Sequence, residues 1–212
     1  MHLADGTMPL IQAAGYGAIS AGFVAAGVKK YYKNSSGNPD YKIISGVFTA
    51  FVFISTVFEI PMPFGSSEHP TGTPLMAIFL GPLITPFLSL MVLLLELFLR
   101  EGAVTTLGAN VFSLGVVGGT VGWLLYNTSR KMGLNIFLAG LIAGMLGDLS
   151  VYLATAGQLA LGNMEGRSFY YYFLFYLPGQ IPLAVVEGIF TGIALNFLKK
   201  RRPGTLEKFN IQ

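Results

Sequence analysis

Cysteine is absent from this sequence of 212 residues, which excludes disulfides, thiolate metal ligands and a nucleophilic thiol. Charge is scarce as well: Asp, Glu, Lys and Arg make up only 11% of the chain, against about 25% in an ordinary soluble domain. Histidine occurs just twice, so His2 and His69 are the whole supply of imidazole. The opening MHLADG contains an acid and no Lys or Arg, so a cleavable signal peptide with a basic start is not expected.

Enzyme signatures are missing too. The sequence contains no phosphate-binding glycine loop of the Walker type, so the chain is not expected to hydrolyse ATP by itself. No serine shares a recognisable motif with a histidine base, and no two histidines have the helical spacing seen in membrane metalloproteases. A hydrolase therefore stays only a minor alternative, and no nucleic-acid partner is predicted.

Apolar residues dominate what is present. They make up 53% of the chain, with Gly 27 and Phe 17, and this predicts an all-α integral membrane protein, a bundle of about seven transmembrane helices. The stretch 74–99 is longer than one span needs, and Gly81-Pro82 divides it into a short, partly re-entrant helix and a full one. The predicted segments are 9–28, 43–60, 74–81, 83–99, a fifth run that follows TTLGAN and ends at Tyr126, 134–159 and 170–197.

Seven spans place the two termini on opposite sides of the membrane, and the positive-inside rule then chooses the orientation. With the N-terminus outside, eleven of the thirteen Lys and Arg residues lie inside and two lie outside. We therefore predict one transmembrane domain over residues 1–202, with its N-terminus outside, and a short cytoplasmic tail over 203–212. The inner residues are Lys29, Lys30, Lys33, Lys42, Arg130, Lys131, Lys199, Lys200, Arg201, Arg202 and Lys208, and the outer ones are Arg100 and Arg167.

Three separated stretches then converge at the outer face: Met1-His2, the loop GSSEHPTGT that carries His69, and TTLGAN at 105–110. The α-amine of Met1, the amide nitrogen of His2 and the imidazole Nδ1 of His2 are only a few bonds apart and can chelate one metal ion through fused rings. Histidine is the commonest metal ligand, and His69 is available for the open fourth position. The alternatives are that His2 is an accident of the start site and that His69 is a solvated loop residue.

Five acids need an interpretation. Asp5 and Glu68 are near the histidines in sequence and could orient an imidazole or attract a cation, or simply be solvated. The others, Glu96, Asp148 and Glu187, lie within apolar segments, where ionisable groups are costly and usually face the protein interior. We favour a structural role for these three, as hydrogen-bonded carboxyls that tie helices together. A proton path is the alternative, but no basic residue is placed to pair with them.

The first apolar segment has small residues at every fourth position. Such spacing lets two helices approach closely in lipid, where packing drives association. One row is a candidate docking face for a separate membrane subunit, and an internal helix contact is at least as good an explanation. The docking row is Ala14, Ala18, Gly22 and Ala26, and the parallel row is Ala13, Gly17, Ala21 and Ala25.

Several of these motifs occur together in one family. MHLADG, GSSEHPTGT, TTLGANVFSLGVVG and PLAVVEGIFTG resemble the CbiM/NikM family, the substrate-binding membrane components of energy-coupling-factor transporters for cobalt and nickel. The resemblance covers nearly the whole chain, and the surroundings of His69 look more like the cobalt branch. It implies seven helices, an N-terminus tucked into the bundle from outside, and a divalent ion, Co²⁺ or Ni²⁺, bound by Met1, His2 and His69. One departure is Arg100-Glu101-Gly102-Ala103, where many relatives have His or Asp before a glycine pair.

The resemblance also implies supporting residues and partners. Thr71, Thr105, Thr106 and Asn110 are candidates for holding the ligand residues by hydrogen bonds, although helix capping explains the last three nearly as well. A transmembrane coupling protein, a pair of cytoplasmic ATPases and a small accessory membrane subunit are the implied partners, and no organic cofactor is implied. The main rival is a vitamin-binding component on the same scaffold, which would need an aromatic-lined outer cavity and would not need the terminal amine.

Overall fold

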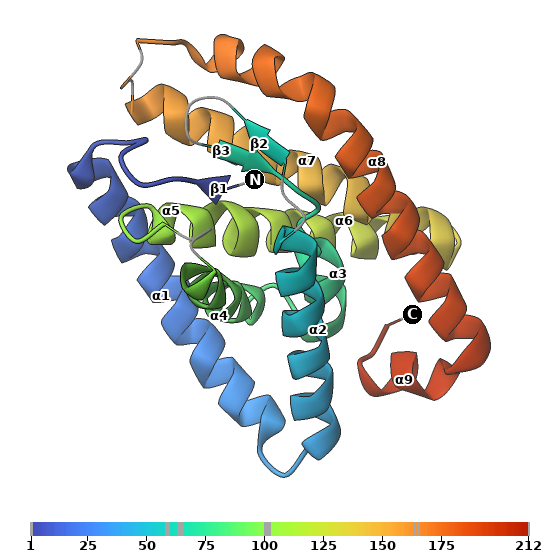
Figure 1. The fold of residues 1–212 in the computed structure, drawn as a ribbon. Coiled ribbons are helices and arrows are strands. Elements are labelled where there is room, and N and C mark those ends of the chain that lie inside the picture. The colour runs from blue at the N-terminus through green and yellow to red at the C-terminus, as the bar shows by residue number, and fades with distance from the viewer. Residues whose placement is uncertain are drawn as a thin grey trace.

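The computed structural model describes residues 2–57, 60–62, 66–99, 103–162, 164 and 166–211, and it is almost entirely helical (Figure 1). Five helical stretches are long and apolar enough to cross a membrane, by length and composition. They are α1 (Leu10–Ser35), α2 (Pro39–Val57), the continuous stretch Leu107–Lys131, α7 (Ile136–Gly162) and α8 (Phe169–Arg201). The prediction of an all-α membrane protein is confirmed.

All seven predicted segments are helical, but two are short. The third is α3 (Thr73–Leu80), which is buried along its whole length and ends where Gly81 adopts φ +90°. The fourth is α4 (Thr85–Phe98), an apolar helix too short to count among the five spans. The break predicted at Gly81-Pro82 therefore exists, because a left-handed glycine and a proline stop one helix before the next begins.

The fifth segment is one helical stretch with a wide middle turn. It consists of α5 (Leu107–Val111), a π-helix η1 (Phe112–Gly118) and α6 (Gly119–Lys131). A Cβ added to Gly115 or Gly119 would overlap Pro86 or Thr85 of α4, and one at Gly122 would overlap Pro74 of α3. These glycines let the fifth segment lie directly against α3 and α4, which fixes the centre of the bundle.

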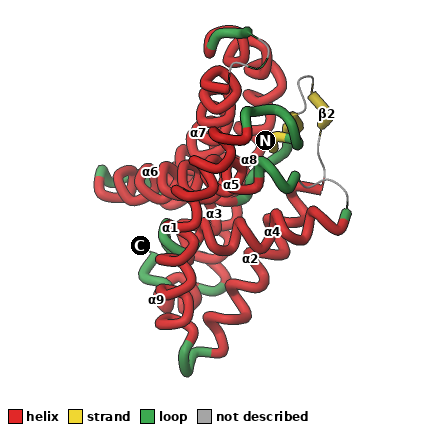
Figure 2. Tube along the Cα trace, turned by 90° about the vertical axis from the view of Figure 1, so that its left-hand side faces the viewer, coloured by secondary structure: helices red, strands yellow, loops and turns green. Residues whose placement is uncertain are grey.

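A small three-stranded sheet was not predicted. Its strands are β1 (His2–Leu3), β3 (Ser66–Glu68) and β2 (Ile60–Met62), in the spatial order β1-β3-β2, and both pairings are antiparallel. His2 pairs with Ser67, so the start of the chain is fastened to the loop that carries His69. The strands lie beside the upper part of the bundle in Figure 2, near α7 and α8.

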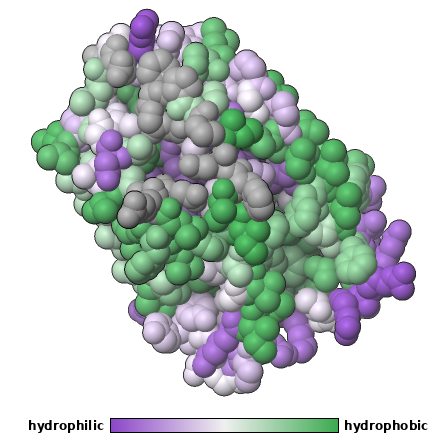
Figure 3. All heavy atoms as spheres, viewed as in Figure 1, coloured by the Kyte–Doolittle hydropathy of each residue, from purple (hydrophilic) through white to green (hydrophobic). Residues whose placement is uncertain are grey.

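Basic residues gather at one end of the molecule. The α1–α2 turn, the α6–α7 turn and the end of α8 lie along the bottom and right of the molecule in Figure 1, and the α7–α8 connection lies at the upper left. Hydrophobic side chains cover much of the face in Figure 3, over α1, α2 and α8, and hydrophilic ones gather below and near the end of α8. This arrangement agrees with the charge pattern of the sequence, and the N-out orientation stays a prediction.

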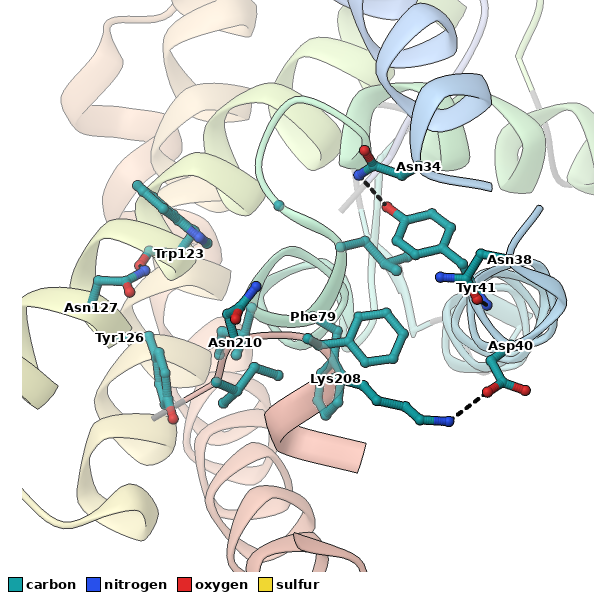
Figure 4. Close-up of a pocket in the computed structure, with 15 residues that line it drawn as sticks. Asn34, Asn38, Asp40, Tyr41, Phe79, Trp123, Tyr126, Asn127, Lys208 and Asn210 are labelled. Carbon is teal, nitrogen blue, oxygen red and sulfur yellow. Dashed lines mark hydrogen bonds and ion pairs between the residues drawn. The ribbon is translucent and has the colours of Figure 1, made fainter. Parts of the chain in front are cut away.

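The C-terminal residues pack back on the bundle. The short helix α9 (Pro203–Lys208) buries Leu206, and Phe209 stacks on Tyr41 with ring centroids 5.8 Å apart. Lys208 Nζ lies 2.6 Å from Asp40 Oδ2, but both side chains are more than half exposed, so this pair contributes only about 0–1 kcal/mol. Beside them is a cavity of about 610 Å³ that also contacts α6 (Figure 4). The division of the chain at residue 202 stays a prediction.

Candidate metal centre

The two histidines lie side by side. His2 belongs to β1 and His69 follows β3 directly, so the antiparallel pairing of these strands brings them together. Their ring centroids are 4.3 Å apart, at an interplanar angle of 48°, and both residues are buried. In Figure 1, β1 lies in the middle of the fold, next to β3 and close to α5. The structure therefore brings together the two imidazoles that the sequence provides.

Hydrogen bonds distinguish the ring nitrogens. His69 Nδ1 lies 2.9 Å from the carbonyl oxygen of Pro70. Because a carbonyl oxygen only accepts, Nδ1 carries the proton and Nε2 carries the lone pair that binds metals. His2 Nδ1 lies 3.4 Å from Glu96 Oε2, and His2 Nε2 has no hydrogen-bond partner among the described residues. The expectation that no basic residue is placed to pair with Glu96 is therefore wrong.

Both imidazoles are held in the state that metals bind. Burial lowers the pKa of His2 well below the usual 6.5, and the charge of nearby His69 lowers it further. Burial is also the main cause of the lowered pKa of His69. Neutral imidazole is the form of histidine that binds metals, and both rings are in that form near pH 7. Among the described residues, no three His, Cys, Asp or Glu side chains form a metal site.

The TTLGAN segment holds the start of the chain. Asn110 acts like a neighbouring strand: its Oδ1 accepts from Leu3 N at 2.9 Å, and its Nδ2 donates to Leu3 O at 3.0 Å. Thr106 Oγ1 also donates to Leu3 O, at 2.5 Å. Leu3 itself is fully buried, so its backbone groups need these partners. His2 is therefore positioned from both sides, by β3 and by these two side chains.

Asp5 also holds the N-terminal segment in place, three residues after His2. Its Oδ1 accepts hydrogen bonds from Thr105 N at 2.6 Å and from Thr105 Oγ1 at 2.5 Å. The bond from the Thr105 hydroxyl is the main reason that the pKa of Asp5 is lowered. Asp5 is exposed, and it accepts hydrogen bonds from Thr105 rather than from an imidazole. Its role in the structure is thus to fasten the N-terminal segment to the TTLGAN segment.

Glu68 faces the helices. Its carboxylate is buried and makes no hydrogen bond to the described residues. A Cβ added to Gly179 of α8 would overlap this carboxylate, so Glu68 lies directly against the α8 backbone. The hydroxyl of Tyr152 on α7 is close enough to interact electrostatically with Glu68. This hydroxyl also lacks a hydrogen-bond partner among the described residues. Burial raises the pKa of Glu68 to about 7.

Replacing Glu68 with glutamine is expected to stabilise the metal-free protein at pH 8 and not at pH 4. The raised pKa means that the folded state keeps a proton on Glu68 which the unfolded state loses above about pH 4.5. The wild-type protein therefore loses stability as the pH rises from about 4.5 to 7, and the Gln variant does not. Thermal unfolding in detergent should show a difference of about 1–3 kcal/mol at pH 8. Equal shifts at both pH values would contradict a buried, neutral Glu68.

Two other buried acids tie helices and loops together, as the structural interpretation predicts. Glu187 of α8 accepts hydrogen bonds from the Thr71 and Gly72 amides that follow His69. Asp148 of α7 accepts from Gln180 Nε2 of α8 and lies beside Glu187. Thr71, predicted to support the ligands, donates its hydroxyl to Glu187 rather than to a histidine. The only sequence signal for this cluster was the presence of acids in apolar segments.

The small-residue rows of α1 differ in burial over their first half. Ala14, Ala18, Gly22 and Ala26 are all exposed. In the parallel row, Ala13 is buried and Gly17 lies against α5, where a Cβ added to Gly108 would overlap the Gly17 backbone, but Ala21 and Ala25 are exposed. Of the five spans α1 is the least buried, because only 17% of its apolar 18-residue stretch is buried inside the protein. An apolar groove of about 600 Å³ runs between α1, α4 and α5 and includes Ala14.

Some predicted residues lie outside the described part of the chain. These are Met1, whose amine was predicted to bind the metal, and the Arg100-Glu101-Gly102 departure from the family pattern. Their contribution to the site stays a prediction.

Comparisons with known proteins agree with this architecture. The chain is 36% identical, over its whole length, to the "Cobalt transport protein CbiM" of Geobacter sulfurreducens, but it spans only 63% of that relative. It is 38% identical to the protein of the same name from Clostridium tetani, over 94% of this chain and 85% of the relative. The crystal structure of a truncated transition metal transporter superposes with a TM-score of 0.86 at 25% identity, over 94% of this chain and 99% of that one.

A second solved structure, of a transition metal transporter, has a TM-score of 0.84 at 23% identity and covers all of both chains, which supports the fold. The profile of the family described as "Cobalt uptake substrate-specific transmembrane region" matches residues 2–205. The chain is a multi-pass membrane protein of a prokaryote, and it belongs to the CbiM family of substrate-specific transmembrane components for cobalt uptake.

Proposed function

We propose that this protein captures a divalent transition metal ion at the outer face of the membrane, for ATP-driven uptake by an energy-coupling-factor transporter. The observation that carries the proposal is the buried contact between His2 and His69, with ring centroids 4.3 Å apart. No other imidazole exists in the chain, and a protein that meets a dilute cation gains by holding its few nitrogen ligands neutral and close together.

The proposed donors are four nitrogens: the Met1 amine, the His2 amide, His2 Nδ1 and His69 Nε2. A near-planar nitrogen set suits Ni²⁺, Cu²⁺ or low-spin Co²⁺ and is poor for Mg²⁺ or Ca²⁺. To bind through Nδ1, the neutral His2 ring has to turn away from Glu96 and carry its one proton on Nε2. The Met1 amine and the His2 amide each have to lose a proton, so binding is expected to release protons and to weaken in acid.

Co²⁺ is the proposed physiological cargo and Ni²⁺ the next candidate, because the family profile and the named relatives concern cobalt. Nitrogen sites generally bind Ni²⁺ more tightly than Co²⁺, so metal availability in the cell contributes to the choice. The proposed partners are a transmembrane coupling protein, two cytoplasmic ATPases and a small accessory membrane subunit. We propose the exposed row of α1 (Ala14, Ala18, Gly22 and Ala26) as the face that docks the coupling protein.

Purified protein is expected to bind Co²⁺ and Ni²⁺, with Ni²⁺ at least as tight, while a hundredfold excess of Mg²⁺ displaces neither. Calorimetry at several buffer ionisation enthalpies should also report proton release on binding. Displacement by Mg²⁺ would indicate an oxygen-rich site and contradict the proposal. Tight binding of an organic vitamin by metal-free protein would favour the vitamin rival, and substrate turnover would favour a hydrolase.

A further inference from the structure

Glu187 is connected to His69 through one peptide group. Glu187 Oε2 accepts a hydrogen bond from Thr71 N at 2.6 Å. The carbonyl oxygen of the same peptide group belongs to Pro70, and it lies 2.9 Å from His69 Nδ1. The chain of contacts therefore runs from the Glu187 carboxylate to the Thr71 N–H, across the amide to the Pro70 carbonyl, and on to the imidazole.

Such a chain of hydrogen bonds affects Nε2, the imidazole nitrogen that does not face the Pro70 carbonyl. A carboxylate that attracts the amide proton shifts electron density toward the carbonyl oxygen, which then accepts more strongly from Nδ1–H. Hydrogen bonds in a low-dielectric interior strengthen one another in this way, by about 10–30% per bond. The proton is thereby held on Nδ1, and Nε2 gains strength as a metal donor. Metal-binding histidines commonly have a carboxylate on the other ring nitrogen, and here a peptide group stands between the two.

The geometry around Glu187 fits a fixed carboxylate. Gly72 N donates to Oε1 at 2.9 Å, and Thr71 Oγ1 donates to Oε1 at 2.9 Å. These donors all use Glu187 oxygens as acceptors, so the carboxylate is held from the loop side. Asp148 of α7 lies beside Glu187 and accepts from Gln180 Nε2 of α8.

Helix packing gives Glu187 little freedom to move. A Cβ added to Gly144 of α7 would lie 2.9 Å from the Glu187 carbonyl oxygen, and one at Gly188 would lie 2.7 Å from Leu141 O. The two helices therefore touch backbone to backbone on either side of Glu187. The loop after His69 is thus attached to a closely packed helix pair, and Gly72, at φ +65°, turns from that attachment into α3.

We propose that Glu187 is a positioning residue for the metal site, a remote carboxylate that fixes the tautomer of His69 and strengthens its Nε2 through the Pro70–Thr71 peptide group. This inference rests on the proposed metal-binding function, but its first consequence exists without metal. His69 of the metal-free protein should carry its proton on Nδ1, in a strong and slowly exchanging hydrogen bond.

The test uses the full chain with ¹⁵N-labelled histidine. In metal-free wild-type protein, the ring nitrogen shifts of His69 should show a protonated Nδ1 and an unprotonated Nε2. In Glu187→Gln, which keeps the side-chain size but places an NH₂ group where one oxygen accepted, the Nδ1–H resonance should move upfield. Affinity for Co²⁺ should fall by about 10–100-fold, the usual cost of losing a supporting contact, and the ligand-field bands of bound Co²⁺ should shift.

Glu207→Gln is the matched control. It makes the same chemical change at an exposed glutamate of α9, away from His69, so the Nδ1–H resonance should stay in place and the affinity within about twofold. A proton on Nε2 in the wild-type protein would overturn the proposal, and this result needs no variant to fold. Weaker binding by Glu187→Gln with an unmoved Nδ1–H resonance would also overturn it, as Glu187 would then only support the fold. If wild-type protein shows the expected resonances but binds no Co²⁺ or Ni²⁺, the relay stands and the proposed function fails.

Discussion

His69→Ala is expected to weaken Co²⁺ and Ni²⁺ binding by more than about 100-fold. Loss of a supporting contact alone costs about 10–100-fold, and this substitution removes a ligand nitrogen. His69 is fully buried, and the chain has no third imidazole to take its place. Titration of the purified variant with each ion, followed by absorbance or calorimetry, measures the loss.

Chemical rescue provides the control for that experiment. The substitution leaves a space the size of an imidazole beside His2, so free imidazole added to the variant should restore part of the affinity. Thermal unfolding of metal-free His69→Ala should remain cooperative. Binding that is unchanged in the variant would show that the metal lies elsewhere, and the proposed site would have to be abandoned.

Ala18→Leu is expected to abolish metal uptake while leaving metal affinity within about twofold of wild type. Ala18 is exposed in the middle of α1, the least buried of the five spans, and a leucine there adds bulk where a second helix would need to approach closely. Uptake of Co²⁺ in cells that also contain the coupling protein and ATPases measures the first effect, and titration of the purified variant measures the second.

Ala50→Leu is the matched control, because Ala50 is an exposed alanine on α2 and the chemical change is the same. It should leave both uptake and binding near wild type. If Ala18→Leu also destroys metal binding, the exposed row of α1 supports internal packing and the docking proposal fails. If it changes neither, the coupling protein docks on another face.

The helices could be predicted from the sequence because each apolar run is long and its ends are marked by polar or charged residues. The break at Gly81-Pro82 was predicted for the same reason, since both residues carry a strong local signal. The sheet could not be predicted. Its strands are two or three residues long, too short for any alternation of apolar and polar side chains to be visible.

The site was only partly predictable. The two histidines stood out because the chain has no others, but their contact depends on the pairing of β1 with β3. Asn110 and Thr106 were candidates from the motif, yet nothing local indicates that both bond to Leu3. Long-range partners such as Glu96 with His2 are set by helix packing, and one sequence alone carries no signal for them.

The most direct test of the proposed metal site compares divalent-metal binding by protein with its native N-terminus and by protein carrying one additional Gly before Met1. The extension turns the proposed amine ligand into an amide and leaves His2, His69 and the helices unchanged. The native protein is expected to bind Co²⁺ and Ni²⁺, and the extension is expected to weaken binding by more than about 100-fold. Equal binding by the two proteins would contradict the proposed site, because the terminal amine would then have no part in it.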